Sequence, residues 1–109
     1  MFENEGDTMI VTEYIQVGDL FQKVKNEGRI SESDAKIYFR QIVYGLAQIH
    51  CRNILHRDIK LDNILIDNNY VVKICDFCVS KIMHKGVIIN DQCGTPAYIA
   101  PEIITEEVA

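Results

Sequence analysis

The stretch His56-Arg57-Asp58-Ile59-Lys60-Leu61-Asp62-Asn63 places most of the reactive side chains of this sequence within eight residues. Two apolar runs enclose it, Ile54-Leu55 before it and Ile64-Leu65-Ile66 after it. Short apolar runs bounded by polar residues are typical of strands. We therefore expect residues 56–63 to form a loop held between strands, which is a common position for catalytic groups.

The composition is that of an ordinary globular protein with at most one domain, since 48% of the 109 residues are hydrophobic and 25% are charged. The net charge of -5 argues against a partner that is nucleic acid or an acidic membrane surface, because both require a basic surface. No segment approaches the roughly 20 apolar residues of a membrane span. We expect a cytoplasmic or nuclear protein.

One strand and one short helix are predicted near the N-terminus. The β-forming residues 9–12 follow a turn at residues 4–7 and predict a strand. Asp19 is placed to cap a helix over residues 20–25, and Gly28 follows as its end signal.

The longest predicted helix covers about residues 32–50. Ser31, with Asp34 three residues later, resembles a capping box at its start. Apolar residues recur at steps of three or four and predict one buried stripe: Ala35, Tyr38, Ile42, Leu46 and Ile49.

A β-hairpin is predicted directly after the reactive stretch. Residues 64–66 and 70–74 are apolar and β-forming, and the turn residues 67–69 join them. Residues 76–102 show no clear period, although residues 87–89 are suited to a brief strand. A long irregular segment in a compact domain is usually functional or disordered.

Cys75 and Cys78 form a lone C-x-x-C pair, which leaves a small zinc or redox protein as a remote alternative. Zinc requires a second pair of ligands, and His84 with Cys93 has poor spacing for one. We expect reduced thiols.

The reactive residues suit phosphoryl transfer, because one carboxylate can orient a hydroxyl while a carboxamide and a second carboxylate hold a divalent metal. The order of motifs resembles the signature of eukaryotic protein kinases of the Ser/Thr type. These motifs are His56 to Asn63, then Asp76-Phe77, then Gly94-Thr95-Pro96-Ala97-Tyr98-Ile99-Ala100-Pro101-Glu102. Residues 11–15 and 18–21 resemble the kinase hinge and the short helix after it.

The resemblance implies an α+β chain with the two-lobed protein-kinase-like fold. Residues 1–109 would supply the end of the small lobe, the hinge, and the upper large lobe with the activation segment. We expect a partial domain, because the sequence holds no Gly-rich loop, no strand lysine and no later large-lobe helices.

The resemblance also implies catalytic roles and metal-binding roles. Asp58 would accept or orient the proton of the substrate hydroxyl, and Lys60 would neutralise the transferring phosphoryl group. Asn63 and Asp76 would bind Mg²⁺ on the phosphates of ATP. Arg57 would face the activation segment.

The expected ATP site lies around the hinge. Thr12 would guard the back of the adenine pocket, and backbone groups of Glu13 and Ile15 would bond the adenine edge. Leu65 would pack under the base, and Asp19 would lie near the ribose.

The expected partner is a protein substrate with a Ser or Thr acceptor, which Thr95 would help to seat by contacting Asp58 and Lys60. Asp62 and Asp19 raise the hypothesis of a basic-directed substrate. Two positions depart from the family pattern. Cys78 replaces the glycine of Asp-Phe-Gly, and Asp91 stands where many kinases are phosphorylated on threonine. A pseudokinase or truncated binding module without catalysis stays the alternative.

Overall fold

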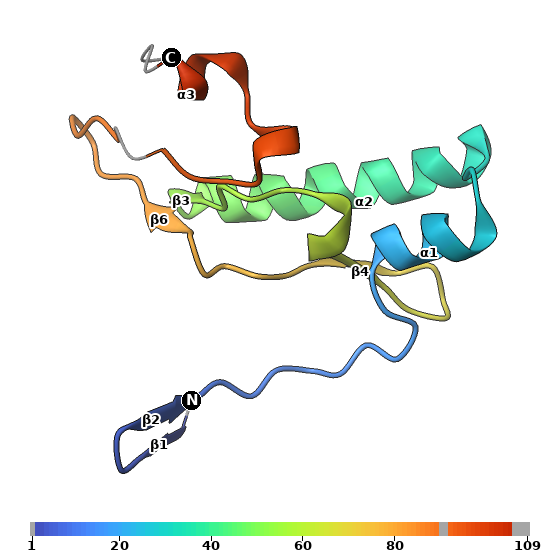
Figure 1. The fold of residues 1–109 in the computed structure, drawn as a ribbon, viewed down its shortest axis with the longest axis horizontal. Coiled ribbons are helices and arrows are strands. Elements are labelled where there is room, and N and C mark those ends of the chain that lie inside the picture. The colour runs from blue at the N-terminus through green and yellow to red at the C-terminus, as the bar shows by residue number, and fades with distance from the viewer. Residues whose placement is uncertain (1, 90–91, 106–109) are drawn as a thin grey trace.

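The computed structural model describes residues 2–89 and 92–105. Two helices and a small hairpin form the body, and short strands flank it (Figure 1). In chain order, the strands and α-helices are β1 (Phe2–Asn4), β2 (Asp7–Met9), α1 (Leu20–Glu27), α2 (Glu32–Cys51), β3 (Ile54–Leu55), β4 (Ile64–Ile66), β5 (Val72–Ile74), β6 (Lys81–Ile82) and α3 (Pro101–Ile104). Single 3₁₀ turns occupy Leu61–Asn63 and Pro96–Tyr98.

Helix α1 begins and ends at the predicted signals. The Asp19 side chain accepts a hydrogen bond from the N–H of Gln22 at 2.8 Å, which satisfies a free donor of the first turn. Gly28 has φ 81° and donates its N–H to the carbonyl of Val24. The positive φ is the conformation that glycine adopts without strain, so the helix stops there.

Helix α2 confirms the predicted stripe. Ser31 caps it by accepting the N–H of Asp34 at 3.2 Å. Tyr38 is 2% exposed, and the other stripe residues are half-buried. Outside the stripe, Phe39 and Tyr44 are each 68% exposed. One face of α2 thus packs on the body, while the other is bare in the described part of the chain.

The core joins α1, α2 and the β4–β5 hairpin. Its buried side chains are Leu20, Tyr38, Ile64 and Ile66. The two strands pair antiparallel as the predicted hairpin, with Ile64 opposite Ile74, although the second strand begins at Val72 and not at residue 70. Gln41 on α2 locks the hairpin to the helix: its Nε2 donates to the carbonyl of Tyr70 at 2.7 Å and its Oε1 accepts the N–H of Val72 at 2.9 Å.

Two strand predictions are wrong. The N-terminal strand is Asp7–Met9, paired with Phe2–Asn4, and residues 10–17 form no strand. Residues 87–89 form none either; instead β3 pairs with Lys81–Ile82. A strand requires a partner edge as well as β-forming residues. Within the described chain, Ile54 lies opposite Ile82, and residues 10–12 have no such partner.

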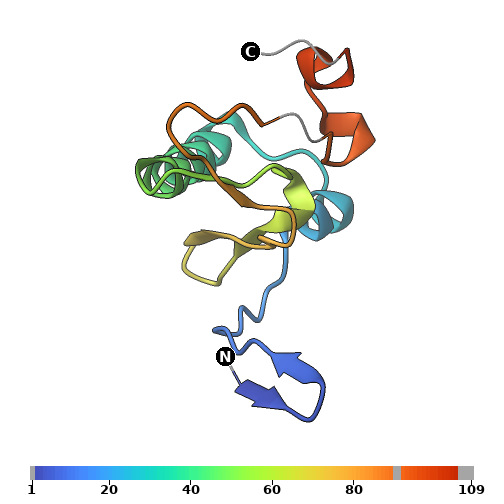
Figure 2. The same ribbon diagram turned by 90° about the vertical axis from the view of Figure 1, so that its left-hand side faces the viewer.

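The β1–β2 hairpin lies apart from the body at the end of an extended segment, as Figures 1 and 2 both show. This segment, residues 10–17, exposes large apolar side chains, including Ile10, Val11 and Tyr14. No helix in the described residues is long and apolar enough to cross a membrane.

Candidate active site

His56 joins the reactive loop to the strand end that carries Asp76. It is 2% exposed, and its Nδ1 accepts the N–H of Asp58 at 3.1 Å. Since Nδ1 accepts, we assign the ring proton to Nε2, which lies 2.7 Å from the carbonyl oxygen of Cys75 and donates to it. The ring also contacts Phe77 edge-on, with centroids 4.8 Å apart. His56 therefore acts as a structural link.

The backbone has positive φ at two site residues that are not glycine, Arg57 at 71° and Asp76 at 62°. Such conformations are uncommon and tend to persist at functional sites where surrounding contacts enforce them. At Arg57 one such contact is the hydrogen bond from its Nε to the carbonyl of Val79 at 2.7 Å. Arg57 thus ties the loop to the segment that follows Asp76.

Asp58 has two differently occupied carboxylate oxygens. Its Oδ1 accepts two hydrogen bonds from Thr95, from the N–H at 3.1 Å and from the hydroxyl at 2.7 Å. Its Oδ2 lies 3.4 Å from Nδ2 of Asn63 and 3.9 Å from Nζ of Lys60. Thr95 therefore fixes one oxygen, and the other faces the polar groups of the loop. The predicted contact of Thr95 with Asp58 is confirmed.

Asn63 is 5% exposed, and its Nδ2 donates to the backbone carbonyl of Asp58 at 2.8 Å. Because this bond holds the amide nitrogen of Asn63, the side-chain carbonyl oxygen of Asn63 points away from the backbone carbonyl of Asp58. The N–H of Cys75 donates to the backbone carbonyl of Asn63 at 2.9 Å, so Asp76 follows directly after the residue that pairs with Asn63.

Asp76 is exposed, and its Oδ1 accepts the N–H of Cys78 at 3.2 Å. A hydrogen bond from the Cys78 thiol and this N–H hold the pKa of Asp76 below its usual value. The carboxylate is thus ionised at neutral pH. Together, an amide oxygen and a carboxylate oxygen are the hard ligands that Mg²⁺ prefers.

The cysteines do not form a zinc site in the part of the chain that the structure describes, where no three His, Cys, Asp or Glu side chains gather around one point. Burial raises the pKa of the Cys75 thiol, and the bond to Asp76 raises the pKa of Cys78. All four cysteines are free thiols, as expected. Cys78 is also free of the positive φ that would strain a side chain there.

The expected ATP-binding residues lie along the extended segment and the outer side of the hairpin. Thr12 and Glu13 are exposed and Ile15 is half-buried. Asp19 forms a bridge with Leu65, so this part of the segment lies against β4. The structure brings Asp19 and Leu65 together but leaves Thr12 on the exposed segment. The Asp19 carboxylate caps α1 and is already hydrogen-bonded.

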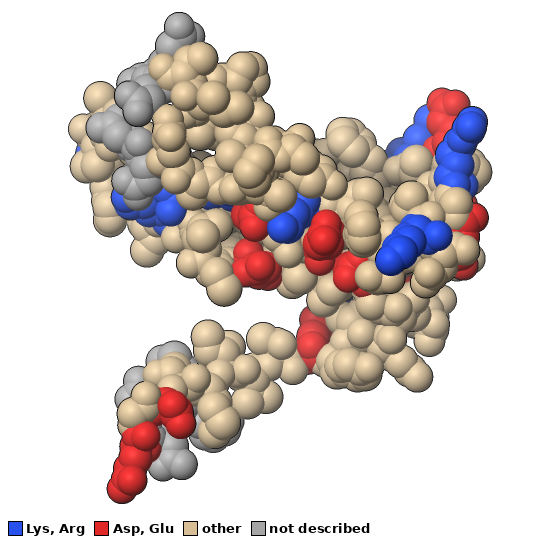
Figure 3. Space-filling view, in the orientation of Figure 1, with Lys and Arg blue, Asp and Glu red and all other residues tan. Residues whose placement is uncertain are grey.

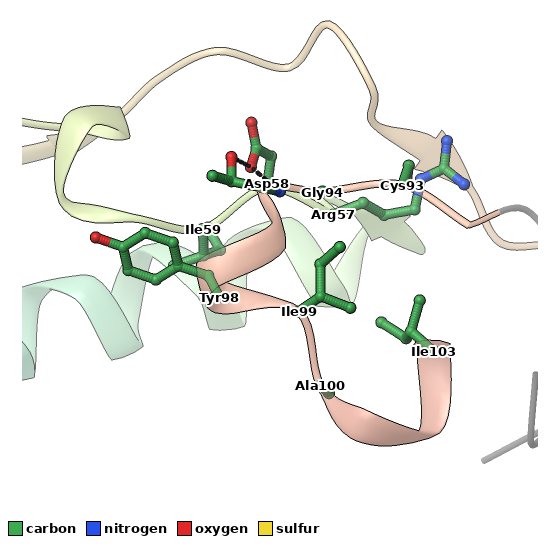
Figure 4. A pocket seen from close by; sticks show the side chains of 10 residues that line it. Arg57, Asp58, Ile59, Cys93, Gly94, Tyr98, Ile99, Ala100 and Ile103 are labelled. Atoms are coloured by element: carbon green, nitrogen blue, oxygen red, sulfur yellow. Dashed lines mark hydrogen bonds between the residues drawn. The ribbon is translucent and has the colours of Figure 1, made fainter. Parts of the chain in front are cut away.

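A pocket of about 240 Å³ adjoins Asp58 on its Thr95 side. Figure 4 shows Asp58 at its edge, with Tyr98, Ile99 and Ile103 along the apolar side. Sequence reasoning assigned no site role to its lining residues Ile59, Cys93, Tyr98 and Ile103. The signal available was the kinase-like motif at residues 94–102, which predicted Thr95 at Asp58 but not a cavity. Asp91 lies outside the described residues.

Comparison with known proteins gives one family and several relatives. The sequence model of the protein kinase domain matches residues 1–109. The chain is 44% identical over 104 residues to NUAK family SNF1-like kinase 2 of Rattus norvegicus, covering 95% of this chain and 16% of that protein. It is 40% identical over 99 residues to serine/threonine protein kinase OSK3 of Oryza sativa subsp. indica, covering 91% and 20%.

A third relative is CBL-interacting serine/threonine-protein kinase 24 of Arabidopsis thaliana, which is 40% identical over 97 residues, covering 88% of this chain and 22% of that protein. The chain thus spans about a fifth of the length of the curated relatives it matches.

Proposed function

The chain belongs to the protein kinase domain family, and we propose that the complete protein transfers the γ-phosphoryl group of ATP to Ser or Thr hydroxyls of a protein substrate. The family match confirms the expected α+β class and the partial two-lobed fold. Two of the relatives named above, from Oryza sativa and Arabidopsis thaliana, are serine/threonine kinases by name, which supports the acceptor.

The observation that carries the proposal is the arrangement around Asp58. Thr95 holds Oδ1 through two hydrogen bonds, so Oδ2 is the oxygen left to orient the substrate hydroxyl and accept its proton. Lys60 lies on the Oδ2 side, where its positive charge would meet the transferring phosphoryl group. A base held in this way loses little freedom when the substrate arrives, which favours reaction.

Asn63 and Asp76 would hold Mg²⁺, and their oxygen donors fit it as described above. When bound, the metal neutralises charge on the phosphate oxygens of ATP. The protein's own contribution is position: the Asn63 amide is fixed by the carbonyl of Asp58, and the Asp76 carboxylate is held by the backbone N–H of Cys78.

The test is phosphoryl transfer by the protein at its full natural length, with Asp58→Asn as the variant. We expect a loss of about 10²–10⁴-fold in kcat, the usual contribution of a positioned acid or base, while nucleotide binding is retained. Asp7→Asn is the matched control, because Asp7 is exposed in the distant hairpin. Full activity of Asp58→Asn would contradict the proposal.

The alternative is a protein that binds partners without catalysis. One observation favours it: the Cys78 thiol bonds the carboxylate expected to bind metal. Under this alternative, the unchanged full-length protein would bind nucleotide weakly or not at all, and it would transfer no phosphate.

We also infer a basic-directed substrate preference. Acidic side chains lie along the middle of the face shown in Figure 3, and Asp62 in the loop is exposed. Asp19 contributes less than expected because it caps α1. Comparing peptides with Arg or Ala before the acceptor would test this. The cytoplasmic or nuclear location stays a prediction.

A further inference from the structure

The extended segment that would bind the adenine edge is attached to the β4–β5 hairpin at two levels. The first attachment is made by the backbone: the N–H of Ile66 donates to the carbonyl of Gly18 at 2.9 Å, and Asp19 bridges to Leu65. The second is made by side chains, where Nζ of Lys73 lies 3.1 Å from Oε1 of Glu13. Four residues, 14–17, therefore lie between Glu13 and the backbone attachment at Gly18.

Lys73 extends from a rigid surface. In the hairpin register Lys73 lies directly opposite Leu65, so the two side chains project from the same side of the two strands. The other side carries Ile64 and Ile66, each 2% exposed in the core. Because those residues anchor the hairpin in the core, the backbone that carries Lys73 has a fixed position. Both side chains of the ion pair are partly exposed.

We propose that Lys73 is a positioning residue for the nucleotide: through Glu13 it holds the backbone of residues 13–15 at a set distance from Leu65. The inference rests on the proposed function, in which that backbone bonds the adenine edge and Leu65 packs under the base. Without the ion pair, the segment between Glu13 and Gly18 has more conformations to lose when ATP binds. Ordering a flexible segment on binding weakens affinity.

The test compares Lys73→Met, Lys73→Arg and Glu13→Gln in the full-length protein, with a fluorescent ATP analogue as the binding probe and steady-state transfer as the second readout. We expect Lys73→Met and Glu13→Gln each to raise the nucleotide Kd and the KM for ATP by about two- to fivefold, the range an exposed ion pair supports. The kcat and the KM for protein substrate should stay unchanged. Lys73→Arg should retain most of the affinity, and the loss should shrink at high salt.

Lys36→Met is the control, because it removes another lysine–glutamate ion pair, with Glu32, which is more exposed and lies on the remote start of α2. Exchanging the charges with Lys73→Glu and Glu13→Lys together should recover part of the lost affinity. Equal effects of Lys73→Met and Lys36→Met, a fall in kcat at unchanged KM, or tighter binding by Lys73→Met would overturn the positioning role alone. Failure of the unchanged protein to bind nucleotide would overturn both this role and the proposed function.

Discussion

Removing the hydroxyl of Thr95 should slow phosphoryl transfer without weakening ATP binding. The variant is Thr95→Val, which keeps the branched shape and removes the 2.7 Å hydrogen bond to Oδ1 of Asp58. The backbone N–H of Thr95, 3.1 Å from the same oxygen, remains. Asp58 then keeps one of its two fixing bonds, so its carboxylate rotates more freely and spends less time in the reactive orientation.

The magnitude follows from the bond that is lost. A hydrogen bond to a charged group contributes about 1.5–3 kcal/mol, which corresponds to about 10- to 100-fold in rate if all of it acts on the transition state. Because the N–H bond remains, we expect the lower end, a fall in kcat of about tenfold. The KM for ATP should not change, since Thr95 contacts Asp58 and not the hairpin or the extended segment.

The assay is steady-state transfer to a Ser or Thr peptide by the full-length protein, with kcat and KM measured separately. Thr95→Ser is the control, because it keeps the hydroxyl and should stay within about threefold of the unchanged protein. If Thr95→Val retained full kcat, or if Ser and Val were equally slow, the hydrogen bond to Asp58 would not be what orients the carboxylate.

Three further predictions concern stability and rate. Tyr38→Phe should leave the free energy of unfolding unchanged or raise it by about 1 kcal/mol, because the Tyr38 hydroxyl is buried with no hydrogen-bond partner among the described residues. Burial raises the pKa of Tyr38 above 10.0, so the parent protein should lose stability through this residue as the pH rises past 10, and Tyr38→Phe should not. Urea unfolding measures both effects, with Tyr70→Phe as the control. A loss of stability in Tyr38→Phe would contradict the argument. Gly94→Ala should lower the free energy of unfolding by about 1–3 kcal/mol, because Gly94 has φ 116° and a Cβ there would lie 3.2 Å from the carbonyl oxygen of Arg57. Gly86→Ala is the control and should lower it less, because Gly86 has φ 81° but no atom near the added Cβ. Equal losses would show that the contact with Arg57 is unimportant. Cys78→Gly should raise the transfer rate by no more than about tenfold, because glycine restores backbone freedom near Asp76 and such a backbone effect is worth ~1 kcal/mol. A slower variant would show that the cysteine side chain assists the reaction.

The local elements were readable because their signals act over a few residues. The Asp19 cap, the Gly28 stop, the Ser31 cap and the stripe of α2 each depend on side chains within one or two helical turns. The β4–β5 hairpin was predicted for the same reason: two β-forming runs and a turn of polar residues are contiguous in the chain.

The strands that pair over a distance were not readable. Ile54 lies opposite Ile82 because the loop between them, with His56 and Arg57 anchored at residues 75 and 79, folds back along β3. By composition alone, the apolar residues 87–89 are better suited to a strand than Lys81 and Ile82. Strand pairing is decided by which edges meet in space, and propensity alone does not specify that.

The sequence by itself determined the family, the candidate reactive residues and the helices, because a fixed order of motifs and short-range helix signals are both contained in the chain. Only the tertiary structure decided how those residues are used: that Thr95 occupies one oxygen of Asp58, that the amide of Asn63 is held by the carbonyl of Asp58, and that Lys73 reaches Glu13. Each of these contacts joins groups through three-dimensional packing. Their distances depend on the buried hairpin and on α2, which no local pattern encodes.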